Sequence, residues 1–290
     1  MHDTTTGRKP PICHLVRLMR PKQWLKNAFV LAPLMFTSAF LDADSLRAAA
    51  LAALLFCLAS SSVYIVNDIR DIEHDRRHSG KSATRPLASG AISIRAAILL
   101  LCVLYAALAA GCFFIPSVIT AIAAYLFLNL AYSFVLKSLP VFDIFCIAAG
   151  FVLRVLAGAD ALGVPLSPWM FITSLCLALY LAAVKRRQEL ARSGADGRKV
   201  LERYSIELID RYAEMSATGA LVFYSLFVVS ARPQLAITVP LVLFGLFRYW
   251  YVVDALDGGE SPTEALISDK VLFLTVLLWI AACVWILWPA

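Results

Sequence analysis

The sequence predicts an all-α, polytopic membrane protein, and three observations lead to this prediction. The 290 residues are 61% hydrophobic, with a mean hydropathy of +0.77. Uncharged runs of about 18 residues or more, the length that spans a bilayer as a helix, recur along the chain. Lys and Arg gather in a few segments between these runs, as is typical of loops on the cytoplasmic side of a membrane. This composition excludes a soluble globular protein.

The apolar runs predict about nine membrane-spanning helices in one domain, residues 1–290, because no Pro/Gly/Ser-rich linker divides the chain. The first span is short and its start is poorly defined. The expected spans are 27–41, 45–66, 94–114, 116–136, 141–160, 166–184, 212–231, 235–253 and 271–289.

Residues 1–14 are expected to form a flexible N-terminal segment. Basic residues lie in this region, but no apolar core precedes a small-residue cleavage site. The pattern therefore does not predict a removable signal peptide.

The distribution of Lys and Arg predicts the orientation. In a nine-span arrangement, 23 of the 26 Lys and Arg residues fall on one side, and Arg47 and Arg232 fall on the other. Arg154 is left within a span. We therefore expect a cell-membrane (inner or plasma membrane) protein with a cytoplasmic N-terminus and active site and an outside C-terminus. The net charge of +6 fits this asymmetry and anionic lipid headgroups, rather than nucleic acid.

The cysteines and histidines do not predict a metal site. The seven cysteines are scattered without CxxC spacing, as is typical of small apolar packing residues. His74 and His78 are four residues apart, but the sequence offers them no obvious third ligand.

The most informative motif is NDIRDIEHD at the end of the second expected span, with Asn67, Asp68, Asp71 and Asp75. On a helix turning about 100° per residue, these four side chains share roughly a quarter of the circumference. Such an oxygen-rich face repels itself unless a cation neutralises it, and Mg2+ prefers carboxylates shared with substrate phosphates. The alternative is a solvated acidic helix end paired with the neighbouring Arg70, Arg76 and Arg77.

NDIRDIEHD, followed by RPLASGAIS, resembles the first aspartate-rich motif, NDxxDxxxD, of the UbiA superfamily of intramembrane prenyltransferases. Further segments resemble the branch of decaprenyl-phosphate phosphoribosyltransferases, over about residues 15–288. These segments are RPKQWLKN (20–27), YSFVLKSLPVFD (132–143), GFVLRVLAGA (150–159) and the run from SPWMF to KRRQEL (167–190).

One departure from the wider superfamily supports this branch. Aromatic prenyltransferases carry a second aspartate-rich motif after the sixth span, where this chain has Lys185, Arg186, Arg187 and Glu189. Basic residues there suit contacts with substrate phosphates rather than a second metal on a prenyl diphosphate. The alternative is the ordinary positive charge of a cytoplasmic helix end.

The resemblance implies transfer of 5-phosphoribosyl from 5-phosphoribosyl 1-diphosphate to a long-chain, decaprenyl-like polyprenyl phosphate. It implies Mg2+, or alternatively Mn2+, held by Asn67, Asp68, Asp71 and Asp75 against the leaving diphosphate. Lys81 and Arg85 would neutralise the remaining oxygens. Because the attacking lipid phosphate is already ionised, no general base is required.

The other basic and polar residues near the expected cytoplasmic face can be assigned to the site or to a structural or interfacial role. Five residues are candidates for phosphate binding or form an interfacial anchor: Arg20, Lys22, Gln23, Lys26 and Asn27. Lys137, with Tyr132, is favoured as a site residue and is grouped with Asp68, Asp71 and Asp75 as catalytic. Arg203 and Tyr204 either contact the ribose 5-phosphate or belong to a solvated helix end, and Arg154 is structural or lines a cavity.

Two rival functions stay open at this point. One is a UbiA-type transfer of a prenyl group from prenyl diphosphate to an aromatic or other small acceptor. The other is an ion-coupled transporter, which the nearly charge-free spans disfavour. The sequence leaves open the polyprenyl chain length, the number of metals and the oligomeric state.

Overall fold

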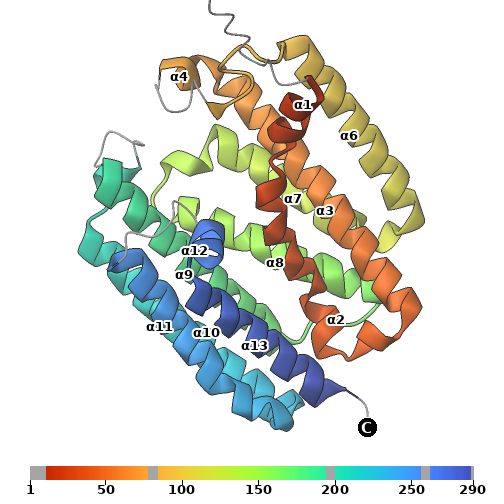
Figure 1. Ribbon diagram of the computed structural model, residues 1–290, viewed down its shortest axis with the longest axis vertical. Coiled ribbons are helices and arrows are strands. Elements are labelled where there is room, and N and C mark those ends of the chain that lie inside the picture. The colour runs from red at the N-terminus through yellow and green to blue at the C-terminus, as the bar shows by residue number, and fades with distance from the viewer. Residues whose placement is uncertain (1–10, 78–83, 194–199, 256–261, 289–290) are drawn as a thin grey trace, which may run out of the picture. The chain divides into compact units, whose positions relative to one another are not determined.

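The computed structural model describes residues 11–77, 84–193, 200–255 and 262–288, and every regular element in these ranges is a helix (Figure 1). The elements in chain order are α1 (Pro11–Met19), η1 (Pro21–Leu31), α2 (Ala32–Phe36), η2 (Ala39–Leu41), α3 (Ala43–Arg70), α4 (Ile72–Arg77), α6 (Ile94–Phe114), η3 (Pro116–Val118), α7 (Ile119–Phe134), η4 (Leu136–Ser138), α8 (Phe142–Leu162), α9 (Pro168–Ser193), η6 (Leu201–Arg203), α10 (Ile206–Ala231), η7 (Pro233–Thr238), α11 (Val239–Asp254), α12 (Pro262–Ser268) and α13 (Lys270–Leu287).

Within these ranges, eight helical segments are long and apolar enough to cross a membrane. They correspond to the second to ninth expected spans, so the all-α membrane fold is confirmed. The first expected span, 27–41, differs because it is divided among η1, α2 and η2. A proline near the start of α2 and the left-handed Ser38 (φ 59°) after it keep this segment from forming one α-helix. Helix α1 begins at Pro11, so residues 11–14 of the segment expected to be flexible are helical.

The described residues group into two compact units. Unit 1 contains the residues up to Leu25 and those of Leu54–Pro116, and unit 2 contains Lys26–Ala53 and the residues from Ser117 onwards. Each unit has its own buried core and is described by itself.

The core of unit 1 joins α1, α3 and α6. Leu18 of α1, Ile65 of α3 and Leu104 of α6 belong to one buried apolar cluster, together with Leu87 from the segment before α6. Figure 1 shows α6 lying alongside α3. The apolar cluster therefore holds the C-terminal part of α3, which carries the acidic motif, against α1.

The core of unit 2 is formed by long helices that lie side by side, with α9 against α10 and against α8, and α11 against α13 (Figure 1). Tyr180 of α9, Ile209 of α10 and Tyr249 of α11 share one buried cluster. A second cluster contains Val155 of α8 and Phe227 of α10. This packing brings the start of α8, the C-terminal part of α9 and the start of α10 together.

Asp269 secures the start of α13. Its carboxylate accepts the Leu272 backbone N–H at 2.6 Å and forms a two-pronged pair with Arg248 of α11, at 3.0 and 2.7 Å. The pair with Arg248 holds the pKa of Asp269 below its usual range. The connection between α11 and α13, which contains α12, is thus anchored where α13 begins.

Candidate functional site

The acidic motif keeps helical geometry across the boundary between α3 and α4. The Asp71 N–H donates to the Asn67 carbonyl at 2.9 Å, and the Asp75 N–H donates to the Asp71 carbonyl at 2.9 Å. These are the i to i−4 bonds of an α-helix. The motif therefore presents its side chains with helical spacing, as the sequence predicts.

Two of the four motif side chains meet at one cation. Nη1 of Arg85 contacts Asp68 Oδ1 at 3.1 Å and also pairs with Asp75 Oδ2. Asp68 and Asp75 are 3% and 2% exposed. Asp68 Oδ1 also accepts Nη2 of Arg20 at 2.5 Å, so one buried carboxylate oxygen bridges two guanidinium groups.

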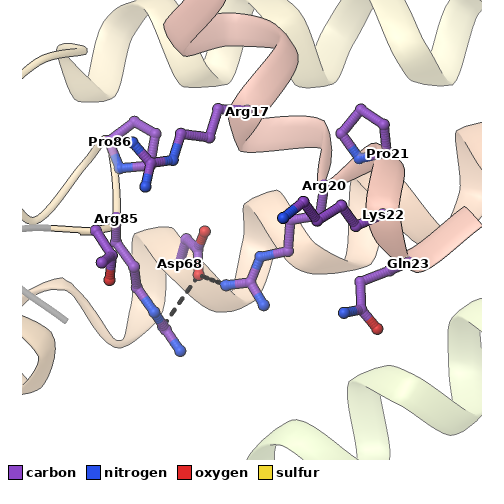
Figure 2. A pocket seen from close by; sticks show the side chains of 9 residues that line it. Arg17, Arg20, Pro21, Lys22, Gln23, Asp68, Arg85 and Pro86 are labelled. Atoms are coloured by element: carbon purple, nitrogen blue, oxygen red, sulfur yellow. Dashed lines mark hydrogen bonds and ion pairs between the residues drawn. The ribbon is translucent and has the colours of Figure 1, made fainter. Parts of the chain in front are cut away.

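A cavity of about 500 Å3 opens beside Asp68 in unit 1. Figure 2 shows Arg20 and Arg85 reaching Asp68 from different sides, with Arg17 and Lys22 on the cavity wall. Among the residues that the structure describes, Arg17 and Lys22 form no ion pair, and both are exposed. Four cations and one carboxylate line this cavity, which makes it suited to an anion. The lining consists of Arg17, Arg20, Pro21, Lys22, Gln23, Asp68, Thr84, Arg85 and Pro86.

The turn between α1 and η1 aims Arg20 at Asp68. Arg20 has φ 55°, which is uncommon for a residue other than glycine, and its guanidinium also lies 4.9 Å from the centre of the Tyr64 ring. From the sequence, Arg20 and Lys22 are candidates for phosphate binding, but Arg17 is not. The basic run before the first span was visible, but the backbone reversal that turns Arg20 inwards has no clear sequence signal.

The second cluster of polar residues lies in unit 2, around Arg186 of α9. Its guanidinium has three side-chain partners: Asp143 at 2.5 Å, Glu189 at 2.5 Å and the Tyr132 hydroxyl at 2.9 Å. Arg186 and Asp143 are both 0% exposed. Such a buried pair is held by good geometry and by further hydrogen bonds to the remaining polar atoms. Arg186 therefore ties α7, α8 and α9 together.

Tyr204 extends this cluster to the segment before α10. Its hydroxyl donates to Asp143 Oδ1 at 2.8 Å and accepts the Val141 backbone N–H at 2.6 Å. Val141 has φ 69°, an outlier for a β-branched residue, and it precedes α8 directly. Burial raises the pKa of the Tyr204 hydroxyl above its usual range, so the group stays protonated and able to donate.

The remaining basic residues of this region differ in their environments. Arg187 pairs with Asp210 at 2.7 Å and with Asp254 at 2.6 Å. Lys185 lies 3.7 Å from Glu189 and is partly exposed. Lys137 lies in the single turn η4 and is partly exposed, and Arg203 is exposed in η6.

The structure buries Asn27 with Arg154 in unit 2. Arg154 donates to the Asn27 side chain at 2.7 Å, to the Gly150 carbonyl at 2.6 Å and to the Tyr125 hydroxyl at 3.1 Å. Its guanidinium also lies over the Tyr125 ring at 4.7 Å. These contacts give Arg154 a structural role in tying η1 to α7 and α8, while Lys26 beside Asn27 is partly exposed. Lys81 lies outside the described residues.

The residues of the acidic motif fit a divalent cation. In the ranges that the structure describes, no group of three or more acidic, His or Cys side chains converges as a metal site. Asp68 and Asp75 do converge on a single cationic nitrogen atom, and Mg2+ needs only one or two protein carboxylates beside substrate phosphates and water. Asn67 and Asp71 lie one helical turn apart on the same segment, and their side chains carry the other oxygen atoms of the motif.

The chain matches the UbiA prenyltransferase family over residues 29–275. It belongs to this family. The UbiA match and the eight apolar helices make the chain a multi-pass membrane protein.

Two curated relatives refine the resemblance. The decaprenyl-phosphate phosphoribosyltransferase of Corynebacterium glutamicum is 35% identical over 92% of this chain and 84% of its own length. The enzyme of that name from Mycolicibacterium smegmatis is 35% identical over 92% of this chain and 90% of its own length. The resemblance to this branch is thereby confirmed.

A solved structure supports the fold. A UbiA homologue of Archaeoglobus fulgidus, bound to GPP and Mg2+, has a TM-score of 0.72 over 94% of this chain and 99% of its own. It is 21% identical in sequence, so it bears on the UbiA fold alone.

Proposed function

We propose that this UbiA-family protein transfers 5-phosphoribosyl from 5-phosphoribosyl 1-diphosphate to a polyprenyl phosphate of the decaprenyl type. The products are polyprenylphosphoryl-5-phosphoribose and diphosphate. The observation that carries this proposal is the 35% identity with curated decaprenyl-phosphate phosphoribosyltransferases over 92% of the chain.

The cavity of unit 1 supports a donor rich in phosphate. Cleavage of the bond between ribose C1 and oxygen leaves negative charge on the diphosphate, which positioned cations stabilise. Arg17, Arg20, Lys22 and Arg85 line one cavity and can supply that charge. Arg17 and Lys22 are exposed there, so we assign them direct contacts with phosphate oxygens.

Asp68 and Asp75 hold the divalent cation in this proposal, with Asn67 and Asp71 as further donors. Mg2+, or Mn2+ in its place, supplies charge neutralisation of the leaving diphosphate. Asp68 also fixes Arg20 at 2.5 Å, so this residue orients a cation on the cavity wall.

The nucleophile in this proposal is a phosphate oxygen of the polyprenyl phosphate acceptor. A phosphate monoester is ionised near neutral pH, so its oxygen attacks ribose C1 without a dedicated base. Lys137, Lys185 and Arg203 are partly or fully exposed in unit 2 and are the residues of that unit that we assign to phosphate contacts. Arg186 and Tyr204 are buried in a protein network, and we assign them to positioning. The membrane supplies the lipid acceptor, and the active site faces the cytoplasm in this proposal.

The basic sequence Lys185 to Arg187 favours this reaction over prenyl transfer to an aromatic acceptor. These residues stand where aromatic prenyltransferases carry their second aspartate-rich motif. The guanidinium groups of Arg186 and Arg187 are paired with carboxylates. A clamp for a second metal on a prenyl diphosphate is therefore disfavoured in this part of the chain.

A radiolabel assay tests the proposal. Purified protein in detergent would receive 5-phosphoribosyl 1-diphosphate labelled in the ribose, polyprenyl phosphate and Mg2+. We expect label in an organic-soluble, acid-labile lipid whose mass equals the polyprenyl phosphate plus phosphoribosyl. A parallel reaction would contain labelled prenyl diphosphate and an aromatic acceptor, and transfer only in that reaction would overturn the proposal.

A further inference from the structure

The pairing of Arg85 with the acidic motif places a guanidinium nitrogen where a metal would be coordinated. One atom, Nη1 of Arg85, contacts carboxylate oxygens of both Asp68 and Asp75. These carboxylates are seven residues apart, or two helical turns, and both are buried. Their convergence on one cation defines a point of concentrated negative charge.

A divalent cation that binds both carboxylates competes with this guanidinium, because it needs oxygen atoms that the guanidinium already contacts. Mg2+ binds oxygen at about 2.0–2.1 Å, whereas the Arg85 nitrogen lies 3.1 Å from Asp68 Oδ1. Asp68 Oδ1 already accepts Arg20 and Arg85, so a divalent cation on this oxygen would be a third cation within a few ångström and would be repelled strongly at low dielectric. Arg85 must therefore move away from at least one carboxylate when the metal binds.

Arg85 has another anion to bind once it moves. Its side chain is 26% exposed and lines the same cavity as Arg17 and Lys22. A diphosphate brought into this cavity with the metal offers acceptor oxygens that replace the carboxylates. A planar guanidinium is well suited to such a phosphate contact.

We propose that Arg85 competes with the divalent cation for Asp68 and Asp75, and that a bound diphosphate relieves this competition by drawing the guanidinium away. This inference deepens the proposed function and rests on it for the identity of the diphosphate. Metal and diphosphate then bind cooperatively. By linkage each ligand raises the affinity for the other by the same factor.

Mn2+ binding to the purified full-length protein in detergent tests this competition. Free Mn2+ would be measured by electron paramagnetic resonance, with and without inorganic diphosphate. The fit would include the separately measured affinity of Mn2+ for diphosphate in solution. In the unaltered protein we expect diphosphate to tighten Mn2+ binding by a factor within about 5–150. Arg85→Gln should bind Mn2+ more tightly than the unaltered protein without diphosphate, and should lose most of the tightening.

Two further variants make the result decisive. Arg76→Gln is the matched control, because Arg76 pairs with Glu73 on the exposed side of α4. It should behave like the unaltered protein. Arg85→Lys keeps one positive charge but presents a single nitrogen, so it should show intermediate coupling. If Arg85→Gln does not fold, the Mn2+ affinity and the coupling of Arg85→Lys test the competition instead.

The outcomes separate this inference from the proposed reaction. Unchanged Mn2+ affinity and unchanged coupling in folded Arg85 variants would overturn the competition, even if the unaltered protein makes phosphoribosyl lipid. Conversely, a missing lipid product with intact Mn2+ coupling to inorganic diphosphate would overturn the donor assignment and leave the competition supported.

Discussion

The carboxylate of Asp143 and the guanidinium of Arg186 form a 2.5 Å ion pair in which neither side chain is accessible to solvent. The pair joins the first turn of α8 to α9, and Glu189, Tyr132 and Tyr204 make further hydrogen bonds to it. A charge buried in this way is stable only with its partner present.

We therefore expect Asp143→Asn to destabilise the protein by about 1–3 kcal/mol, because Glu189 is then the one carboxylate left beside the buried Arg186 among the residues that the structure describes. The change would be measured as a lower Tm of the purified protein in detergent. The control is Asp44→Asn, since Asp44 pairs with Arg47 on the surface and both side chains are more than three-quarters exposed. Equal Tm values for the two variants would show that the Asp143 pair is not needed for stability.

Arg17→Ala and Lys22→Ala should weaken the binding of a phosphate substrate without lowering Tm. Each loses one charge-assisted hydrogen bond, a change of about 1.5–3 kcal/mol, or roughly 10- to 150-fold in the half-saturating concentration. Steady-state kinetics at varied donor and acceptor concentrations would show which substrate each residue contacts. Arg95→Ala, an exposed change at the start of α6, serves as the control. If both variants match this control for both substrates, the cavity is not the phosphate site.

Asp71→Ala should abolish metal-dependent turnover while the protein still folds. The residue lies between α3 and α4, and it is not one of the two carboxylates that the structure ties to Arg85. The measurement is product formation against Mg2+ concentration, with Tm determined in parallel. Glu73→Ala removes an exposed neighbouring carboxylate and should keep activity. Activity near that of the unaltered protein in Asp71→Ala would refute its assignment to the metal.

Gly158→Ala should destabilise unit 2, by about 1–3 kcal/mol for an overpacked core. A Cβ atom at Gly158 of α8 would collide with the Val30 carbonyl of η1 and lie 3.2 Å from Pro33. Backbone atoms cannot move aside as a flexible side chain can. Gly245→Ala in α11 is the matched control, because its Cβ would meet Thr275 at an ordinary 3.8 Å. A similar Tm for both variants would contradict this close approach.

The long helices and the acidic motif could be predicted from the sequence because their signals are local. Apolar runs of bilayer length predict spans, and the spacing of Asp68 and Asp75 predicts a shared helix face. Both predictions are confirmed by the helices and by the convergence of the two side chains on Arg85. The division of the first span could not be predicted, because the 3-10 geometry of η1 depends on packing as well as on composition.

The partners of the basic residues could not be predicted, because they are far apart in the sequence. Arg186 and Asp143 are separated by 43 positions, and Arg85 and Asp68 by 17. A basic residue at a helix end has the same local sequence whether it binds a substrate, a lipid or a buried carboxylate. The functions of Lys26, Lys137, Lys185 and Arg203 stay predictions for this reason.

The ion pairs of α9 also determine how unit 2 attracts charged molecules from a distance. The two cations Arg186 and Arg187 lie at contact distance from four carboxylates, so this group carries no excess of positive charge; the carboxylates are those of Asp143, Glu189, Asp210 and Asp254. The field of such paired charges falls off faster than that of isolated cations. Long-range capture of an anionic substrate should therefore depend on Arg17 and Lys22 in the unit 1 cavity, because Arg20 and Arg85 are paired with carboxylates as well. The association rate should fall steeply with ionic strength.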